Sequence, residues 1–332
     1  MNRVAARALP YLLPALLLGL AVSLIVSQTS RPAAVLDMWR PWGEIGALAA
    51  AMTAIVLTGG IDLSVGSIIA LCSVSFGLCW QHGLPLPWCG AVAVSIGFVA
   101  GAVNGTLVTL GVAPLVATLA TMAFYAGLAM ALSRGQRVAG LPESFTALGQ
   151  DSWLGVPNQL VLFLAVMLAA WIVVHHTRWG RYLFAIGENR VAARFAAVPL
   201  LPVEWTLYAA SGTVAGLVAL VYTARGGASV PNAGAGVELQ TIACVVLGGT
   251  RVTGGSGGVG RTLLGVAVMS LLDIGLQFVS RKVHVPWSDV PWQLTGNSRL
   301  VLVGVLVIGV AIWNERSSAN RLARQAAAQN VT

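Results

Sequence analysis

Long apolar runs, separated by shorter polar stretches, recur along the chain. Most of them approach the ~20 residues that a helix needs to cross the hydrocarbon of a bilayer. We expect about ten membrane-spanning helices, with eight to eleven compatible with the pattern because two of the runs are short. The expected spans are residues 9–26, 44–58, 68–80, 88–110, 115–132, 160–174, 203–223, 238–247, 262–278 and 300–313. The pattern predicts an all-α, polytopic integral membrane protein.

The composition also indicates a protein whose surroundings are membrane lipid. The chain has 332 residues, of which 57% are hydrophobic and 9% are charged, whereas soluble domains usually carry about 25% charged residues. The net charge of +8 comes from basic residues in short loops between apolar runs. That distribution follows the positive-inside rule and offers no continuous basic face for nucleic acid.

The first apolar run predicts the orientation of the chain. Arg3 and Arg7 precede it, and it is longer than the core of a secretory signal, so we expect a retained helix with a cytoplasmic N-terminus. Ten spans place both termini in the cytoplasm, which then holds the larger share of the basic residues. We expect a transmembrane permease domain over residues 1–315 and a polar cytoplasmic tail over residues 316–332.

The sequence contains no motif for ATP hydrolysis or other catalysis. Its only lysine, Lys282, is followed by Val283 and lacks the preceding glycine loop of a P-loop. The four cysteines lack metal-ligand spacing, and no nucleophile elbow or His-Glu-x-x-His motif occurs. We expect a protein that is not an enzyme and holds no cofactor or metal; if ATP drives its function, another subunit binds the nucleotide.

A polar break interrupts the apolar pattern at Thr58-Gly-Gly-Ile-Asp-Leu-Ser-Val-Gly-Ser67. Asp62 or Ser64 can cap the helix that follows by accepting its free N–H groups, and a carboxylate there meets the positive end of the helix dipole. Alternatively, Asp62 lines a substrate path, because ionisable residues at membrane depth are costly and often functional. The sequence leaves both interpretations open.

Small and polar residues mark two further helix faces. Gly97, Gly101 and Gly105 are spaced by four, which predicts close contact with another helix. Asn104 lies beside this stripe and is either an interhelical hydrogen-bonding residue or a pore residue. Thr118 and Thr121 share one face of the next span.

Three interior segments are polar or rich in glycine. Residues 133–158 form a long polar stretch, and long loops often face partners. Residues 248–260 contain seven glycines, which we interpret as a tight turn between membrane helices, since no soluble strand precedes them. Residues 178–194 hold four arginines and one glutamate between apolar runs. Charge alone explains this last segment as a solvated, positive-inside loop.

Several stretches together resemble the permease subunits of bacterial ABC sugar importers of the ribose, xylose and autoinducer-2 type. The matching stretches, in the order of the family, are residues 58–67, 101–105, 116–121, 180–189 with 192–193, 238–243 and 245–250. They extend over most of residues 45–262. The chain departs from the family pattern at Ala197, where glycine is usual, at Cys244, where alanine is usual, and at Arg251, which replaces a small polar residue. These departures weaken any assignment of the sugar.

The resemblance implies a bacterial inner-membrane permease that works with partners. It implies two permease chains, identical or paralogous, two ABC ATPase chains and a periplasmic solute-binding protein. The permease would form the path for a monosaccharide or a similar polyol-like solute. The residues expected to line this path are Asp62, Asn104, Thr118, Thr121 and Glu238.

The resemblance also assigns the charged segment, within residues 178–202, to coupling with the ATPase. We expect a short helix from Glu188 to Ala196 that seats in the ATPase, with Glu188 at its start and Arg194 near its end to suit the helix dipole. Gly180 and Gly187 would let the chain turn in and out. The expected coupling residues are Gly180, Arg181, Gly187, Glu188, Asn189, Ala192, Ala193 and Arg194.

Other classes of transporter remain open alternatives. A branched-chain amino-acid ABC permease is one, although residues 59–66 resemble the sugar branch more closely. An ion-coupled secondary transporter is another; it needs ionisable groups at membrane depth, and Asp62, Glu238 and Asp273 are the candidates. A receptor or scaffold would not need the glycine-lined helices.

Overall fold

The computed structural model describes residues 36–280 and residue 304. The chain divides into two compact units, one of which is residues 36–266; the described residues 267–280 and 304 belong to the other. The expected span 9–26, the span 300–313 apart from residue 304, the tail 316–332 and both termini lie outside the described residues, so their predicted orientation stays a prediction.

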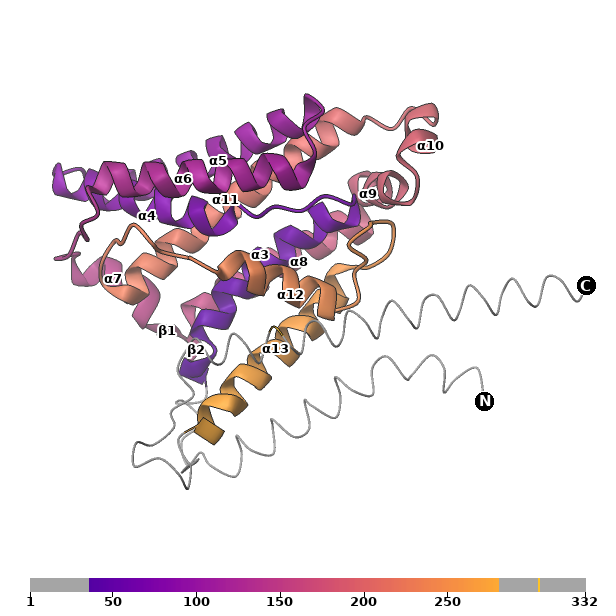
Figure 1. Ribbon diagram of the computed structural model, residues 1–332. Helices are drawn as coiled ribbons and strands as arrows, with labels where there is room; N and C mark the ends of the chain where they lie inside the picture. The colour runs from indigo at the N-terminus through magenta and orange to yellow at the C-terminus, as the bar shows by residue number, and fades with distance from the viewer. Residues whose placement is uncertain (1–35, 281–303, 305–332) are drawn as a thin grey trace, which may run out of the picture. The chain divides into compact units, whose positions relative to one another are not determined.

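The described chain is helical, as the apolar pattern predicts (Figure 1). The helices are α3 (Arg40–Leu57), α4 (Val65–Gln81), α5 (Leu86–Thr109), α6 (Pro114–Ser133), α7 (Glu143–Gln150), α8 (Asn158–His176), α9 (Arg178–Glu188), α10 (Arg190–Phe195), α11 (Leu200–Gly226), α12 (Val237–Leu247) and α13 (Val259–Ser280). Four of these, α5, α6, α8 and α11, are long and apolar enough to cross a membrane, and α4 and α12 are shorter apolar helices. The all-α, polytopic membrane class is therefore confirmed.

Proline and glycine set several helix limits. Pro114 opens α6 and Pro87 lies in the first turn of α5, where a missing N–H costs nothing. α11 ends at Gly226 and is followed by Gly227, whose φ of +66° is the left-handed conformation that stops a helix. The expected polar loop 133–158 is not a loop throughout, because it contains α7 and a short hairpin of β1 (Ser152–Trp153) and β2 (Val156–Pro157).

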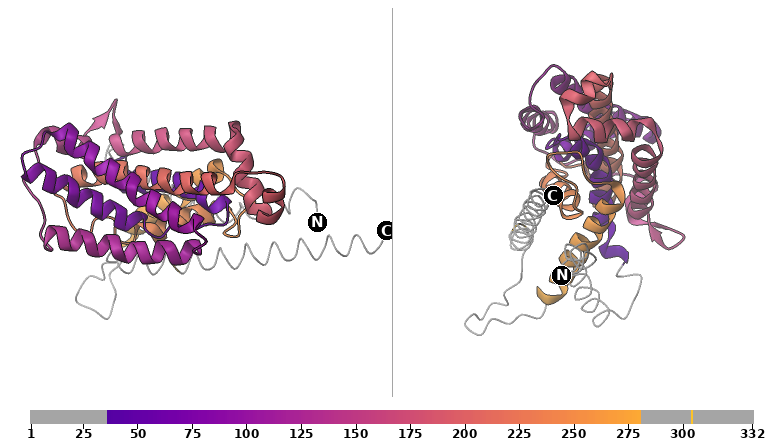
Figure 2. Two further views of the ribbon diagram at one scale, coloured as in Figure 1. Left: turned by 90° about the horizontal axis from the view of Figure 1, so that it is seen from above. Right: turned by 90° about the vertical axis from the view of Figure 1, so that its right-hand side faces the viewer.

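The helix pair with the most extensive contact in residues 36–266 is α5 with α11, which lie side by side in Figure 1 and in the left view of Figure 2. The predicted glycine stripe forms this contact. A Cβ atom on Gly97 would collide with the Gly212 carbonyl oxygen, and one on Gly101 with the Tyr208 carbonyl oxygen. Bare backbone on both helices therefore lets them approach closely, as the spacing predicts.

α8 separates two ends of this unit. The helix α7 and the β1–β2 hairpin precede α8, and α9 and α10 follow it, so the two groups lie at opposite ends of a helix roughly 28 Å long (Figure 1). We call them the hairpin end and the α10 end. α3 and α11 connect the two ends in opposite directions.

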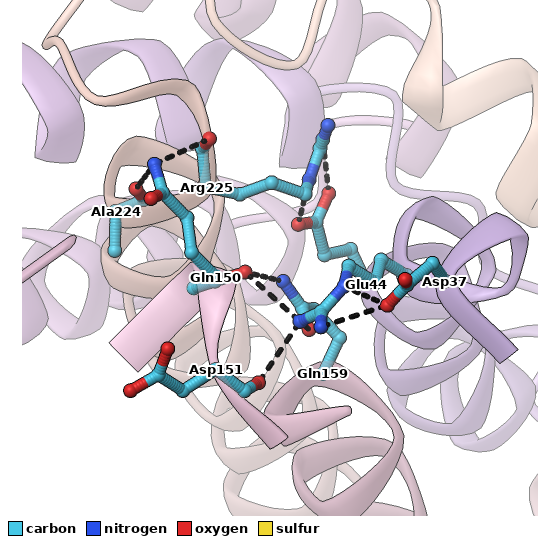
Figure 3. A network of polar contacts seen from close by, with 9 residues as sticks. Asp37, Glu44, Gln150, Asp151, Gln159, Ala224 and Arg225 are labelled. Carbon is cyan, nitrogen blue, oxygen red and sulfur yellow. Dashed lines mark hydrogen bonds and ion pairs between the residues drawn. The ribbon is translucent and has the colours of Figure 1, made fainter. Parts of the chain in front are cut away.

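A polar network fastens the hairpin end (Figure 3). The Arg40 guanidinium donates to the Asp151 carbonyl oxygen at 2.9 Å and to Gln159 Oε1 at 3.1 Å. The buried Glu44 carboxylate accepts from Arg225 Nε and Nη2 at 2.7 and 2.8 Å. A buried carboxylate needs such a partner to remain charged. The ion pair between Glu44 and Arg225 therefore also holds α3 against α11.

Candidate functional site

The charged segment forms two short helices, α9 and α10, rather than one. The expected single helix from Glu188 is wrong at its start, because Glu188 is the last residue of α9 and Asn189 is extended, with φ −156° and ψ 103°. Asn189 Oδ1 accepts the Ala192 N–H at 2.9 Å and caps α10, a role in which asparagine is favoured. Arg194 lies in the last turn of α10, as expected, whereas Glu188 lies at the unfavourable end of a helix dipole.

Gly180 and Gly187 lie inside α9, where they allow close packing and do not turn the chain as expected. A Cβ atom on Gly180 would collide with the Val174 carbonyl, and one on Gly187 with the Leu57 carbonyl oxygen. The sharp turn from α8 into α9 falls instead at Thr177, whose hydroxyl accepts the Trp179 N–H at 3.1 Å.

The C-terminal end of α3 and the glycine-rich segment 248–260 meet α9 at Gly187. This segment is the turn between α12 and α13, as predicted. Its Gly254 and Gly255 have φ of +86° and +74°, and the Gly255 N–H donates to the Leu57 carbonyl oxygen at 3.0 Å. α9 therefore contacts the end of α3 directly, five residues before Asp62.

α10 is tied to α11 by an ion pair that the sequence analysis missed. Arg190 Nη2 donates to Glu204 Oε2 at 2.9 Å, and Nη1 donates to Oε1. Glu204 is buried. The signal available in the sequence is a lone glutamate near the start of the apolar run 203–223, shortly after the arginine-rich segment.

The outer surface of α10 is apolar and exposed. Phe195 is 88% exposed and Val191 is 65% exposed, and the two are one turn apart. Ala192 and Arg194 are exposed as well, whereas Ala193 is buried. Of the other expected coupling residues, Arg181, Glu188 and Asn189 are exposed and Gly180 is buried.

After α10 the chain turns at Ala197, whose φ is +56°. The left-handed conformation favours glycine, which is the residue that the resembling permeases usually carry at this position. The departure noted in the sequence therefore falls on a position with a backbone reason for glycine.

Asp62 lies fully buried between α3 and α4. Its Oδ1 accepts the Ser64 N–H at 2.9 Å and the Ser64 hydroxyl at 2.7 Å, and its Oδ2 accepts the Ser211 hydroxyl from α11 at 3.2 Å. The capping interpretation is wrong in its detail, because the Ser64 side chain makes no capping bond and Asp62 binds the residue before α4. Asp62 instead joins α11 to the start of α4.

Asn104 extends this cluster across to α5. Its Nδ2 donates to the Ser64 hydroxyl at 2.6 Å, so the bond joins α5 to the residue that precedes α4. The Thr118 hydroxyl of α6 donates to the Ile61 carbonyl oxygen at 3.2 Å. The structure therefore brings Asp62, Asn104 and Thr118 together around one short segment.

The other two expected path residues lie beside this cluster. The hydroxyl of Thr121 is buried and donates to the Thr118 carbonyl oxygen at 3.3 Å. Glu238 lies beside Gly66, in the first turn of α4, and accepts the Gly236 N–H at 3.2 Å. The sequence analysis missed Ser211, whose hydroxyl looks unremarkable inside an apolar run, and Tyr208 beside it.

Comparison with known proteins identifies the family. A family model described as the branched-chain amino acid transport system / permease component matches residues 43–311. The autoinducer 2 import system permease protein LsrD of Salmonella typhi is 33% identical over 275 residues, which cover 81% of this chain and 80% of that protein. The LsrD protein of Enterobacter sp. (strain 638) is 34% identical over 272 residues, covering 80% of each chain. The chain belongs to this permease family and is a multi-pass protein of the bacterial inner membrane.

Proposed function

We propose that this chain is the membrane-spanning permease subunit of an ATP-driven importer and forms the path for a monosaccharide or similar polyol-like solute. The relatives named as autoinducer 2 import permeases, which align over about four-fifths of both chains, support an importer. Separate ATPase subunits supply hydrolysis, because the only lysine of the chain lacks a P-loop context. A second permease chain, identical or paralogous, and a periplasmic solute-binding protein complete the assembly.

The observation that carries this proposal is the surface of α10. Phe195 and Val191 expose apolar side chains at a polar end of a membrane protein, and exposed apolar groups rimmed by charge are typical of protein contacts. Helix α10 is too well anchored to be a free loop, since Arg190 ties it to Glu204 and Asn189 caps it. A rigid, partly apolar projection suits a groove in an ATPase.

The distribution of arginine supports a cytoplasmic α10 end, where such an ATPase would be. Among the described residues, the arginines at this end are Arg178, Arg181, Arg190, Arg194, Arg251 and Arg261, and those at the hairpin end are Arg40, Arg134, Arg137 and Arg225. Arg40 and Arg225 have internal partners at the hairpin end, and Arg190 has one at the α10 end. The free positive charge therefore favours the α10 end as the cytoplasmic one.

Two contacts would carry a movement of α9 and α10 into the membrane. Gly187 of α9 packs on Leu57, and the chain runs from there through Gly59 and Gly60 to Asp62. Glu204, Tyr208 and Ser211 follow one another at i, i+4 and i+7, so they share a face of α11 that leads from Arg190 to Asp62. Both sides of the Asp62 cluster would shift when the ATPase moves α10.

The test introduces a bulky, negatively charged side chain on the exposed face of α10. In the purified complex, Ala192→Glu should lower ATP-dependent uptake by roughly tenfold or more, the factor set by ~1.4 kcal/mol of lost docking. The permease should remain folded, because Ala192 is exposed. Ala139→Glu, at an exposed alanine before α7, is the matched control. Normal uptake together with normal ATPase assembly in Ala192→Glu would refute the coupling role.

The branched-chain amino-acid alternative rests on the wording of the family description, and uptake of leucine by the complex would support it. An ion-coupled transporter is the weaker alternative. It would have no use for an exposed, anchored α10.

A further inference from the structure

The cluster around Asp62 has more hydrogen-bonding capacity than the chain uses. Asn104 Oδ1 and the Tyr208 hydroxyl are both buried, and neither has a hydrogen-bond partner within the described residues. In the described part of the chain, the partners of Asp62 are neutral donors from Ser64 and Ser211. Buried polar atoms are nearly always satisfied in native proteins, so these unused atoms point to a ligand.

The atoms converge on one place inside the helix bundle. Ser211 and Tyr208 are three residues apart on α11 and share a face. The Tyr208 hydroxyl lies against Gly60, where an added Cβ atom would sit 2.8 Å from it. Asn104 reaches the same segment from α5 through its bond to Ser64.

The backbone at this place is irregular. Residues 60–64 are not helical, although Ser211, which contacts Asp62, lies roughly 16 Å along α11 from its first residue. Non-helical backbone at membrane depth is tolerated where it is buried in protein or lines a cavity. Broken helices of this kind form solute sites in other transporters.

We propose that Asp62, Asn104, Tyr208 and Ser211 form a binding site for the hydroxyl groups of a neutral, polyhydroxylated solute. The inference rests on the proposed function and names the residues and the chemistry of the path. In the described conformation, the Ser211 hydroxyl donates to Asp62 Oδ2. When α11 moves away, solute hydroxyls donate to Asp62, and further hydroxyls pair with Asn104 Oδ1 and the Tyr208 hydroxyl.

The donor and acceptor set selects this class of solute. A carboxylate accepts several hydroxyl donors through charge-assisted bonds. An apolar side chain such as that of leucine would leave Asp62, Asn104 and Tyr208 buried and unsatisfied, which is costly. An anionic solute would be repelled by Asp62. A neutral polyol supplies both donors and acceptors at the required density.

The cleanest variant is Tyr208→Phe, because the hydroxyl it removes has no hydrogen-bond partner among the described residues. The melting temperature of the purified complex should not fall, whereas uptake of the transported polyol should decrease roughly tenfold. Tyr125→Phe is the matched control. Its hydroxyl already donates to the Ala100 carbonyl oxygen at 2.9 Å, so its loss should lower stability and leave solute selectivity unchanged.

The decisive measurement compares a polyol with its monodeoxy analogues. The complete complex in proteoliposomes is first given radiolabelled ribose, xylose, ribitol or leucine to find which solute it transports. The uptake rate of the transported polyol is then divided by the uptake rate of each of its monodeoxy analogues. In Asp62→Asn and in Ser211→Ala, the ratio of polyol uptake to analogue uptake should approach one for at least one analogue. In Ser75→Ala, this ratio should stay at the wild-type value. Ser75 is a buried serine bonded to its own helix at Leu71.

Each outcome decides the proposal. A purely structural role would lower uptake of the polyol and its analogues by the same factor, so unchanged ratios in Asp62→Asn, Ser211→Ala and Tyr208→Phe would overturn the site. ATP-dependent uptake of a polyol with unchanged ratios would leave the proposed function standing. Uptake of leucine alone, or of none of the four probes, would overturn both the site and the polyol specificity.

Discussion

At the scale of single residues, glycine controls how closely the helices approach. Gly97 and Gly101 on α5 face backbone atoms of α11, and Gly187 faces the end of α3. Glycine lowers helix propensity by about 1 kcal/mol relative to alanine. That cost is offset where the missing Cβ atom permits backbone contact between helices.

A substitution at Gly101 tests this packing. Gly101→Leu should destabilise the permease by ~1–3 kcal/mol, as overpacking does, because its side chain would meet the Tyr208 backbone and Gly212. The measurement is the loss of helical signal on heating in detergent. Gly127→Leu on α6 is the control, since an added Cβ atom there meets nothing within 4 Å. Equal melting temperatures for the two variants would contradict the close-packed interface.

Two buried carboxylates show opposite solutions to the same problem. Glu44 is neutralised by Arg225 through two short hydrogen bonds, which is the arrangement expected of a structural ion pair. Asp62 has hydroxyl and amide partners in the described residues and no such cation. This contrast supports a structural role for Glu44 and the solute-binding role that we propose for Asp62.

At the scale of elements, α9 and α10 form an anchored projection. α9 is fixed by Gly187 against Leu57, and α10 by Arg190 against Glu204. The turn between the two helices depends on Asn189, which closes one helix and caps the next. A short helix such as α10 is marginal alone, so its cap matters for its shape.

Removal of this cap should weaken coupling. Asn189→Ala should cost ~1 kcal/mol of α10 stability, and ATP-dependent uptake should fall about fivefold, the factor that ~1 kcal/mol represents. Asn189→Asp and Asn189→Ser keep a side-chain acceptor and should restore uptake. Equal uptake in the alanine, aspartate and serine variants would show that the cap does not shape the coupling surface.

The apolar pattern predicts the membrane helices well because both their packed side and their outward-facing side carry apolar side chains along the whole length. The stripe at Gly97, Gly101 and Gly105 likewise reveals a close contact from one helix alone. The break at Asn189 carries no apolar signal, so the limits of α9 and α10 could not be read from the sequence. α7 was hidden for a similar reason, since it is a short helix inside a polar stretch.

Contacts between distant residues account for most of what the sequence did not reveal. Asp62 and Asn104 are polar residues in apolar surroundings, which is a signal in itself. The importance of Ser211 and Glu204 depends on contacts with Asp62 and Arg190, which only the packing of α11 reveals. A serine hydroxyl inside an apolar run usually bonds to its own helix, so Ser211 could not be distinguished from other serines by sequence alone.

At the scale of the whole molecule, the chain is one part of a larger assembly. Its family and its helices make it an inner-membrane permease, while the energy source and the solute selection proposed for it lie in other subunits. The described unit offers a surface for one such subunit at α10 and a buried polar cluster that α10 can reach through α3 and α11. We propose that this arrangement links a cytoplasmic movement of α10 to a solute site inside the membrane.

The central claim is that ATP hydrolysis, and not an ion gradient, drives import through this chain. The most direct test is polyol uptake by proteoliposomes that contain the complete complex. With ATP supplied to the ATPase subunits and the proton and sodium gradients collapsed by ionophores, we expect full uptake. Uptake that persists without ATP and follows an imposed ion gradient would contradict the account.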